Sequence, residues 1–287
     1  EGARFPETVI SMAIEPKTSA DRDKLAEVLA TMAKDDPTFT VRSDEDTGQM
    51  IVSGMGELHL EIIKNRMLSE FKVPANVGEP RVAYKETVQK AAVGEGVFHK
   101  KVGEKMQFAK VRVEVMPAPD TVQAKIQNAA TSDQIPRLFI PLVEEGVRSA
   151  ATGGGAMGYP MINIAVRIVG GEYDAAEASE VAYSAAGALA LRDALERAGS
   201  LLLEPIMKLD VTVPEEYLGD VLNDLNRRRC TIGNIDTVEN ARVINGTVPI
   251  AEMFGYETTL RLLTQGRGSS SLAPSAYRPI PEEIELC

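Results

Sequence analysis

The sequence is poor in the side chains that build metal sites and disulfide frameworks. It contains two cysteines, Cys230 and Cys287, two histidines, His59 and His99, and no tryptophan. Two isolated cysteines do not make a disulfide framework and favour a reducing compartment. Because no Cys/His cluster has zinc-site spacing, we expect no metal site in this chain.

Long apolar runs are also missing. No stretch approaches the ~20 apolar residues that a membrane-spanning helix needs, so no membrane partner is expected. The first residues, Glu1 to Arg4, include neither a starting methionine nor the apolar run of a signal peptide. We therefore expect the sequence to begin inside a longer protein, located in the cytoplasm or in an organelle.

The charge balance is acidic. The formal net charge is −11, from 31 basic and 42 acidic residues. This excess argues against a protein whose whole surface grips nucleic acid, but it permits local basic patches. A length of 287 residues with 44% hydrophobic content predicts about two or three domains.

Two segments share one predicted element order. The first, residues 1–77, has a strand at 9–15, a helix that begins at the caps Thr18 and Ser19, strands at 39–42 and 49–52 joined by a turn at 46–48, a helix after Gly56, and a strand at 75–77. The second, residues 204–275, has a strand at 206–213, a helix at 215–229, a hairpin at 231–249, a helix at 253–263 and a strand at 269–275. Both follow the β-α-β-β-α-β order of ferredoxin-like domains.

The middle segment, residues 78–203, has a different pattern. Strands are expected at 81–88, 106–115 and 161–169, with helices at 136–151 and 177–197, the latter rich in alanine. The predicted fold class is therefore α+β, with two ferredoxin-like domains flanking a middle α+β domain.

Motifs for chemistry are weak. No phosphate-binding G-x-x-x-x-G-K-[ST] loop occurs. The run Gly153 to Gly155 is followed by Tyr159-Pro160 and a strand, which favours a flexible connection over a phosphate cradle. Two histidines in unrelated segments supply no catalytic triad, so this chain is not expected to be an enzyme or to bind a cofactor.

Basic side chains provide the clearest candidate site. Arg227, Arg228 and Arg229 end a predicted helix, where cations complement the helix dipole. Because three consecutive arginines point in different directions, RNA phosphates are an equally good interpretation. The loop from Thr264 to Gly268 includes Gln265 and Arg267 and offers donors on a flexible backbone, although it also fits a solvated loop.

Several longer strings resemble translation elongation factor G. Residues 53–61, Ser-Gly-Met-Gly-Glu-Leu-His-Leu-Glu, and the run from Pro6 to Lys17 resemble its domain III. Five further strings resemble domain V of the same family, at residues 203–208, 217–221, 225–229, 253–256 and the loop 264–268. The strings cover nearly the whole chain in colinear order.

The resemblance implies domain III at 1–77, domain IV at 78–203, domain V at 204–275 and a tail at 276–287 that returns towards domain IV. It implies a left-handed β-α-β crossover in domain IV, against the usual hand. It also implies a monomer that binds the ribosome, with ribosomal RNA and proteins of both subunits as partners and domain IV reaching tRNA and mRNA in the decoding region. GTP and Mg²⁺ would belong to an N-terminal GTPase domain that precedes this segment.

Two loops depart from the family at the expected tip of domain IV. Family members that drive translocation carry roughly Thr-Gly-Gly-Arg-Gly-Gln where this chain has Val102 to Gln107, including Gly103, Glu104 and Lys105. A second loop normally has a histidine after a tyrosine, whereas here Asp174 follows Tyr173. Acidic side chains are repelled by RNA phosphates, so both changes predict altered contacts.

Two functional hypotheses remain open at this point. The first is a divergent elongation factor G paralogue, a ribosome-dependent GTPase in its full length, acting in translocation or in a related step such as ribosome recycling. The second is a ribosome-protection factor that displaces a bound drug or tRNA without translocation.

Overall fold

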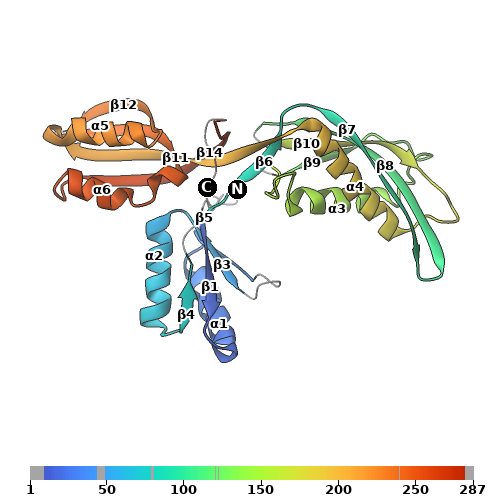
Figure 1. Ribbon diagram of the computed structural model, residues 1–287, viewed down its shortest axis with the longest axis horizontal. Helices are drawn as coiled ribbons and strands as arrows, with labels where there is room; N and C mark the ends of the chain where they lie inside the picture. Colours follow the sequence, from blue (N-terminus) through green and yellow to red (C-terminus); the bar gives the residue numbers. More distant parts are fainter. Residues whose placement is uncertain are drawn as a thin grey trace. The chain divides into compact units, whose positions relative to one another are not determined.

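The computed structural model describes residues 10–43, 49–78, 81–119, 121, 123–238 and 240–281, except for the side chains of residues 19 and 20 (Figure 1). The turn predicted at 46–48 lies outside these residues. The chain folds into two compact units. Unit 1 combines Glu1–Ala83 with Glu204–Arg278, and unit 2 combines Tyr84–Leu203 with Pro279–Cys287.

The N-terminal part of unit 1 has the predicted β-α-β-β-α-β order. Its elements are β1 (Ile10–Pro16), α1 (Ser19–Asp35), β2 (Thr40–Ser43), β3 (Met50–Gly54), α2 (Glu57–Asn65), continued by a π turn (Arg66–Glu70), and β4 (Ala75–Val77). The sheet order is β2-β3-β1-β4. Alternate β1 residues, Ile10, Met12 and Ile14, are buried with Leu25 and Leu29 of α1.

The C-terminal part of unit 1 repeats this topology. Its elements are β11 (Ser200–Pro214), a 3-10 turn (Glu215–Tyr217), α5 (Leu218–Arg227), β12 (Thr231–Val238), β13 (Ala241–Pro249), a second 3-10 turn (Ile250–Met253), α6 (Tyr256–Leu263) and β14 (Ser269–Pro279). The order β12-β13-β11-β14 is the same permutation as in the first sheet. Both sheets therefore have the ferredoxin-like arrangement that the sequence predicts.

Unit 2 is a four-stranded sheet with helices packed against it. Its elements are β6 (Lys85–Val88), β7 (Ala92–Val102), β8 (Lys105–Pro117), β9 (Lys125–Asn128), α3 (Ile140–Gly153), β10 (Ile164–Glu172) and α4 (Glu180–Ala198). The sheet order is β7-β8-β10-β9, and only β9 and β10 are parallel among its neighbouring strands. Helix α3 connects this parallel pair, which makes β9-α3-β10 the β-α-β unit of the domain.

One helix face and one sheet face build the core of unit 2. Val111, Val113 and Val115 of β8 are fully buried together with Ala186 and Ala190 of α4. These β8 residues alternate with exposed or partly exposed ones, so the opposite face of the sheet carries the polar side chains.

Three sequence predictions need correction. The single strand predicted at 81–88 is wrong, because β5 (Arg81–Val82) pairs with β1 whereas β6 pairs with Ser200–Leu203 of β11. The helix predicted at 253–263 is interrupted, since Gly255 adopts a φ of 70° before α6 begins. The strand predicted at 269–275 continues to Pro279, and the amide of Ile280 donates to the Leu202 carbonyl at 3.0 Å.

Strand β7 was not predicted at all. Its glycines suppress strand propensity, but the packing requires them. A Cβ at Gly96 would lie 2.0 Å from the Ala186 oxygen, and a Cβ at Gly94 would lie 2.2 Å from the Ala194 nitrogen. The backbone of β7 therefore lies directly against α4, which only glycine allows.

Candidate functional site

The long β7–β8 hairpin projects from unit 2 (Figure 1). Val102 pairs with Lys105, so Gly103 and Glu104 form a two-residue turn. Gly103 has a φ of 64°, which suits the first central position of a type II′ turn. Gly103, Glu104 and Lys105 are exposed, so the hairpin end presents one acidic and one basic side chain to solvent.

The distal hairpin is basic although the chain is acidic. Lys100, Lys101 and Lys105 are exposed, and none of them forms an ion pair with a described residue. The Lys100 ammonium lies 6.0 Å from the centre of the Phe98 ring. Residues 100–105 hold three lysines and one glutamate, which leaves a local formal charge of +2 in a chain of −11.

The second tip loop, which contains Tyr173 and Asp174, packs against the β7–β8 hairpin through Glu177. The amide of Phe108 donates to the Glu177 carbonyl at 2.8 Å, and the imidazole Nε2 of His99 lies 3.4 Å from the Glu177 carboxylate. The Asp174 side chain stabilises its own loop, since its Oδ1 accepts a hydrogen bond from the Ala176 amide at 2.8 Å. The Asp174 side chain thus already has a backbone donor.

Gln107 lies away from the hairpin turn and is partly buried. The hydroxyl of Ser179 donates to its Oε1 at 2.6 Å, and Ser179 also caps α4 by accepting from the Ala182 amide. The structure therefore joins Gln107 to the second loop rather than to Gly103 and Glu104. Its side-chain oxygen is engaged within the protein.

Tyr173 is the exposed aromatic residue of the second loop. It is 44% exposed, and its ring lies 6.3 Å from that of Phe139. Beneath it Tyr183 stacks on Phe139 at 4.5 Å and donates to the Glu172 carbonyl at 3.1 Å. Burial raises the pKa of Tyr183 to about 12, and the hydrogen bond from its hydroxyl to Glu172 anchors the start of the loop.

The three arginines at the end of α5 have different environments. Arg228 donates to Asp224 at 2.8 Å and to the Thr259 hydroxyl at 3.2 Å, and its guanidinium lies 5.1 Å from the Tyr256 ring centre. Arg227 is exposed and has no partner among the described residues.

Arg229 is directed into the protein. Its backbone has a φ of 57°, and its side chain forms a fork with both oxygens of Glu204 at 2.8 and 2.9 Å. It also donates to Glu252 at 2.8 Å. Hydrogen bonding to Glu204 raises the pKa of Arg229. The sequence prediction treated the three arginines alike, whereas Arg227 is the one whose guanidinium is free to meet an external phosphate.

The loop after α6 also contains an engaged arginine. Arg267 donates to Glu216 and to the Tyr217 hydroxyl, and its guanidinium lies 4.8 Å from the Tyr217 ring centre. Gln265 is exposed and has a φ of 51°, a left-handed conformation that is uncommon for this residue type. Gln265 is therefore presented to solvent by a tightly turned backbone.

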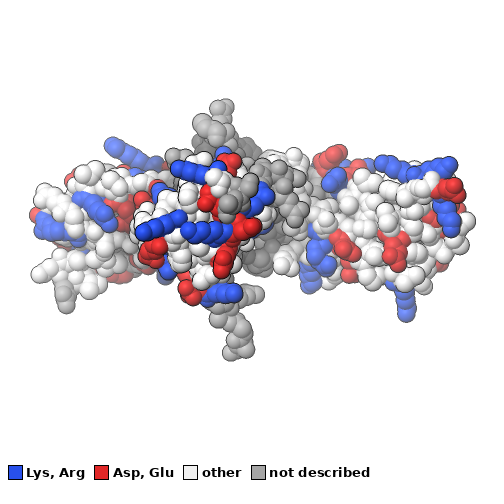
Figure 2. Space-filling model, turned by 90° about the horizontal axis from the view of Figure 1, so that it is seen from below, with Lys and Arg blue, Asp and Glu red and all other residues white. Residues whose placement is uncertain are grey.

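Charges of both signs are interspersed over the face seen in Figure 2, without a continuous field of one sign.

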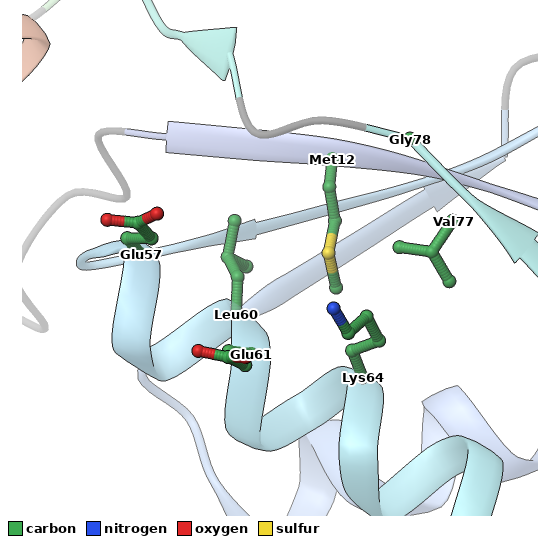
Figure 3. A pocket seen from close by; sticks show the side chains of 7 residues that line it. All are labelled: Met12, Glu57, Leu60, Glu61, Lys64, Val77 and Gly78. Carbon is green, nitrogen blue, oxygen red and sulfur yellow. The ribbon is translucent and has the colours of Figure 1, made fainter. Parts of the chain in front are cut away.

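A hollow of about 220 Å³ lies between α2 and the first sheet, and Figure 3 shows Met12, Leu60 and Lys64 lining it. No group of three metal-ligating side chains occurs within the described residues. None of the helices in the described ranges is long and apolar enough to span a membrane.

Sequence reasoning missed His99, Lys100 and Lys101 as site residues because it missed β7. The alternation of exposed and buried residues along β7 is visible only in the structure. Glycine at the buried positions 94 and 96 concealed it, since glycine carries no hydrophobic side chain to mark the inward face.

Comparisons with known proteins agree across the whole chain. Residues 5–79 match the family model of elongation factor G domain III, 80–199 match domain IV, and 201–286 match the elongation factor G C-terminus. Elongation factor G of Aquifex pyrophilus is 46% identical over 285 residues, covering 99% of this chain and 41% of that protein.

A solved structure shares the fold of this chain. A crystal structure from Thermus thermophilus has a TM-score of 0.77 and 33% sequence identity, covering 98% of this chain and 42% of that one. The chain thus spans about two fifths of the length of these relatives. Three family domains in colinear order, together with the ferredoxin-like sheets on either side of unit 2 in the sequence, establish that this chain belongs to the elongation factor G family and carries its domains III and IV and its C-terminal domain.

Proposed function

We propose that this chain is the ribosome-binding part of a translation elongation factor that acts in tRNA and mRNA translocation or in a related step such as ribosome recycling. The observation that carries the proposal is the colinear match to three elongation factor G domains over residues 5–286. In this proposal GTP and Mg²⁺ are used by a GTPase domain outside these residues, and protein biosynthesis is the process served.

The exposed basic groups support contacts with RNA. Arg227 and Gln265 lie on the C-terminal domain and would face ribosomal RNA, where phosphates accept hydrogen bonds from both side-chain types. Arg228, Arg229 and Arg267 would support these contacts indirectly, because their guanidinium groups bind protein acceptors. The hairpin end at Gly103, Glu104 and Lys105 and the loop at Tyr173 and Asp174 would approach tRNA and mRNA.

The acidic residue Glu104 at the hairpin end favours a weaker contact with RNA than a glycine- and arginine-bearing loop would make. Glu104 places a carboxylate at the hairpin end, beside Lys105. A carboxylate close to RNA phosphates reduces binding through repulsion that salt screens. We propose that the protein is a divergent member whose contact in the decoding region is weaker than that of a member with a glycine-rich, arginine-bearing loop.

A competition experiment tests the proposal. Because the chain would occupy the factor site without hydrolysing GTP, an excess of it should slow single-turnover translocation by a complete elongation factor G. The slowing should be relieved by raising the concentration of the complete factor. An unchanged translocation rate at a large excess of the chain would refute ribosome binding at that site.

The alternative is a ribosome-protection factor, which the departures in both tip loops favour. Release of a labelled decoding-site inhibitor from ribosomes separates the two functions. The chain should leave the inhibitor bound if the elongation-factor proposal holds, whereas rapid release without any effect on translocation would favour protection.

A further inference from the structure

The sheet of unit 2 has two edges of very different length. Strand β9 forms one edge and is 4 residues long, whereas β7 forms the other and is 11 residues long. A long open edge strand presents a row of backbone donors and acceptors with which another strand can pair, and native proteins protect such edges. Shortness protects β9, so β7 is the edge that requires another form of protection.

The outward-facing backbone groups of β7 belong to its odd-numbered residues. Val102 pairs with Lys105 across the two-residue turn, so these two residues exchange hydrogen bonds, and bonded pairs recur at every second position. The odd-numbered residues therefore direct their N–H and C=O groups away from β8. The hydrogen bond from the Glu95 amide to Asp193 of α4 agrees with this direction.

Much of this edge is open. Val93 and Val97, on either side of Glu95, are 45% and 47% exposed. Neither valine forms a hydrogen bond outside the β7–β8 ladder with any residue that the structure describes. A hollow of about 510 Å³ lies beside Glu95 and Val97, and Leu189 and Asp193 of α4 line its other side. The edge thus combines unpaired backbone groups, exposed valines and open space beside them.

The Asp193 carboxylate occupies the middle of this edge. Its Oδ2 accepts from the Glu95 amide at 2.8 Å, and its Oδ1 accepts from the Arg197 guanidinium at 3.0 Å. The first bond uses the one outward donor between Val93 and Val97. A strand that paired here would bring a carbonyl oxygen to the same amide and would meet the carboxylate. The negative charge repels that oxygen, and its removal from water is costly.

We infer that Asp193 is a guard residue, one that keeps the β7 edge from pairing with the β7 edge of a second copy of this chain. A second copy fits the edge because an antiparallel pairing centred on Val97 brings no like charges together. Val97 would lie opposite its own counterpart, and Glu95 would lie opposite the histidine at position 99 of the second copy. Lys101 would lie opposite the uncharged Val93.

This inference concerns self-association and does not rest on the proposed function, because its test uses no ribosome. The test is sedimentation velocity of the 287-residue chain over a wide range of concentration. The unaltered chain should remain monomeric, whereas Asp193→Ala should shift from monomer to dimer as its concentration rises. Alanine is the best helix former, so α4 should fold in this variant. Arg197→Gln removes the ion pair but leaves the carboxylate on the Glu95 amide, and it should stay monomeric.

Two further measurements locate the surface. Val97→Lys in the Asp193→Ala background places like charges opposite one another at the centre of the paired edges and should restore the monomer. Hydrogen exchange of the Glu95 amide should be faster in dilute Asp193→Ala than in the unaltered chain, and it should slow again at high concentration, where a second strand supplies the acceptor.

Three results would each overturn the inference. They are a dimeric unaltered chain, an Asp193→Ala variant that stays folded and monomeric at every concentration, and a dimer that Val97→Lys leaves intact.

Discussion

Arg229 and Glu204 form a two-pronged ion pair, with both guanidinium Nη atoms within 2.9 Å of the two carboxylate oxygens. Glu204 is 3% exposed, and its carboxylate lies at the point in β11 where the chain enters the C-terminal part of unit 1. A carboxylate buried this deeply is stable only when it is paired and hydrogen-bonded. The third arginine of the cluster is therefore a structural residue of its domain.

Removing the Arg229 fork should destabilise the fold. We expect Arg229→Gln to lower the free energy of unfolding by about 2–4 kcal/mol, because it leaves Glu204 buried without its cation. Arg227→Gln removes the same charge from an exposed position and should change it by less than about 0.5 kcal/mol. Urea unfolding of both variants measures the difference, and equal stabilities would show that the Glu204 pair does not support the domain.

Close packing of β7 on α4 predicts a steric effect. Gly96→Ala places a Cβ 2.0 Å from the Ala186 oxygen, and the contact atom is backbone, which cannot rotate away. We expect a loss of about 1–3 kcal/mol or more in unfolding free energy. Gly153→Ala is the control, since no atom lies within 4 Å of its Cβ position. Thermal unfolding that is the same for the two variants would contradict the packing.

Asp36 predicts a specific pH dependence of stability. The Thr38 hydroxyl donates to the Asp36 carboxylate, and the His59 imidazole Nε2 lies 3.2 Å from it. These contacts lower the pKa of Asp36 from its ordinary value in the folded protein. A depressed carboxyl pKa contributes stability above the unfolded-state value, about 3.9, and that contribution disappears as the pH falls through the folded-state pKa. Asp36→Asn should therefore be less stable than the unaltered chain at neutral pH, and the difference should shrink at acid pH.

The stabilities of the Asp36→Asn variant and the unaltered chain are compared by unfolding at neutral pH and at about pH 3, which is below the unfolded-state pKa. Asp35→Asn, on the adjacent exposed position, controls for the general loss of negative charge. A difference between the Asp36→Asn variant and the unaltered chain that stays constant with pH would show that the carboxylate is not stabilised by its neighbours.

The tip carboxylate predicts a salt-dependent effect on RNA. Glu104→Gln should strengthen binding of the chain to ribosomes by about two- to threefold at low ionic strength, because it removes repulsion between an exposed carboxylate and phosphates. The gain should vanish at high salt, where exposed charges are screened. Glu196→Gln, at an exposed position in the last turn of α4 and far from both tip loops in the sequence, is the charge-matched control and should leave the affinity unchanged.

Periodicity predicted much of the fold. The spacing of Leu25, Leu29 and Met32 predicted α1, and the alternation of Ile164, Val166 and Ile168 predicted β10. Both patterns work because one face of each element is buried, so the sequence records the period directly. The element order of the two ferredoxin-like segments followed from such patterns.

The remaining features depend on tertiary contacts that leave little trace in sequence. Gly94 and Gly96 are required by α4, which lies almost a hundred residues away, so no local pattern announces β7. The partners of Arg228 and Arg229 are equally non-local, and three arginines in a row look alike until their acceptors are known. The resemblance to the family places both tip loops, whereas the hydrogen bond from Ser179 to Gln107 joins residues 72 positions apart and has no signature in the sequence.

The most direct test of the central claim is an equilibrium titration of the fluorescently labelled 287-residue chain with ribosomes, followed by displacement with a complete elongation factor G. We expect saturable binding that the complete factor displaces and that Arg227→Gln weakens, while Lys125→Gln does not. Absence of saturable binding, or binding that the complete factor leaves intact, would contradict it.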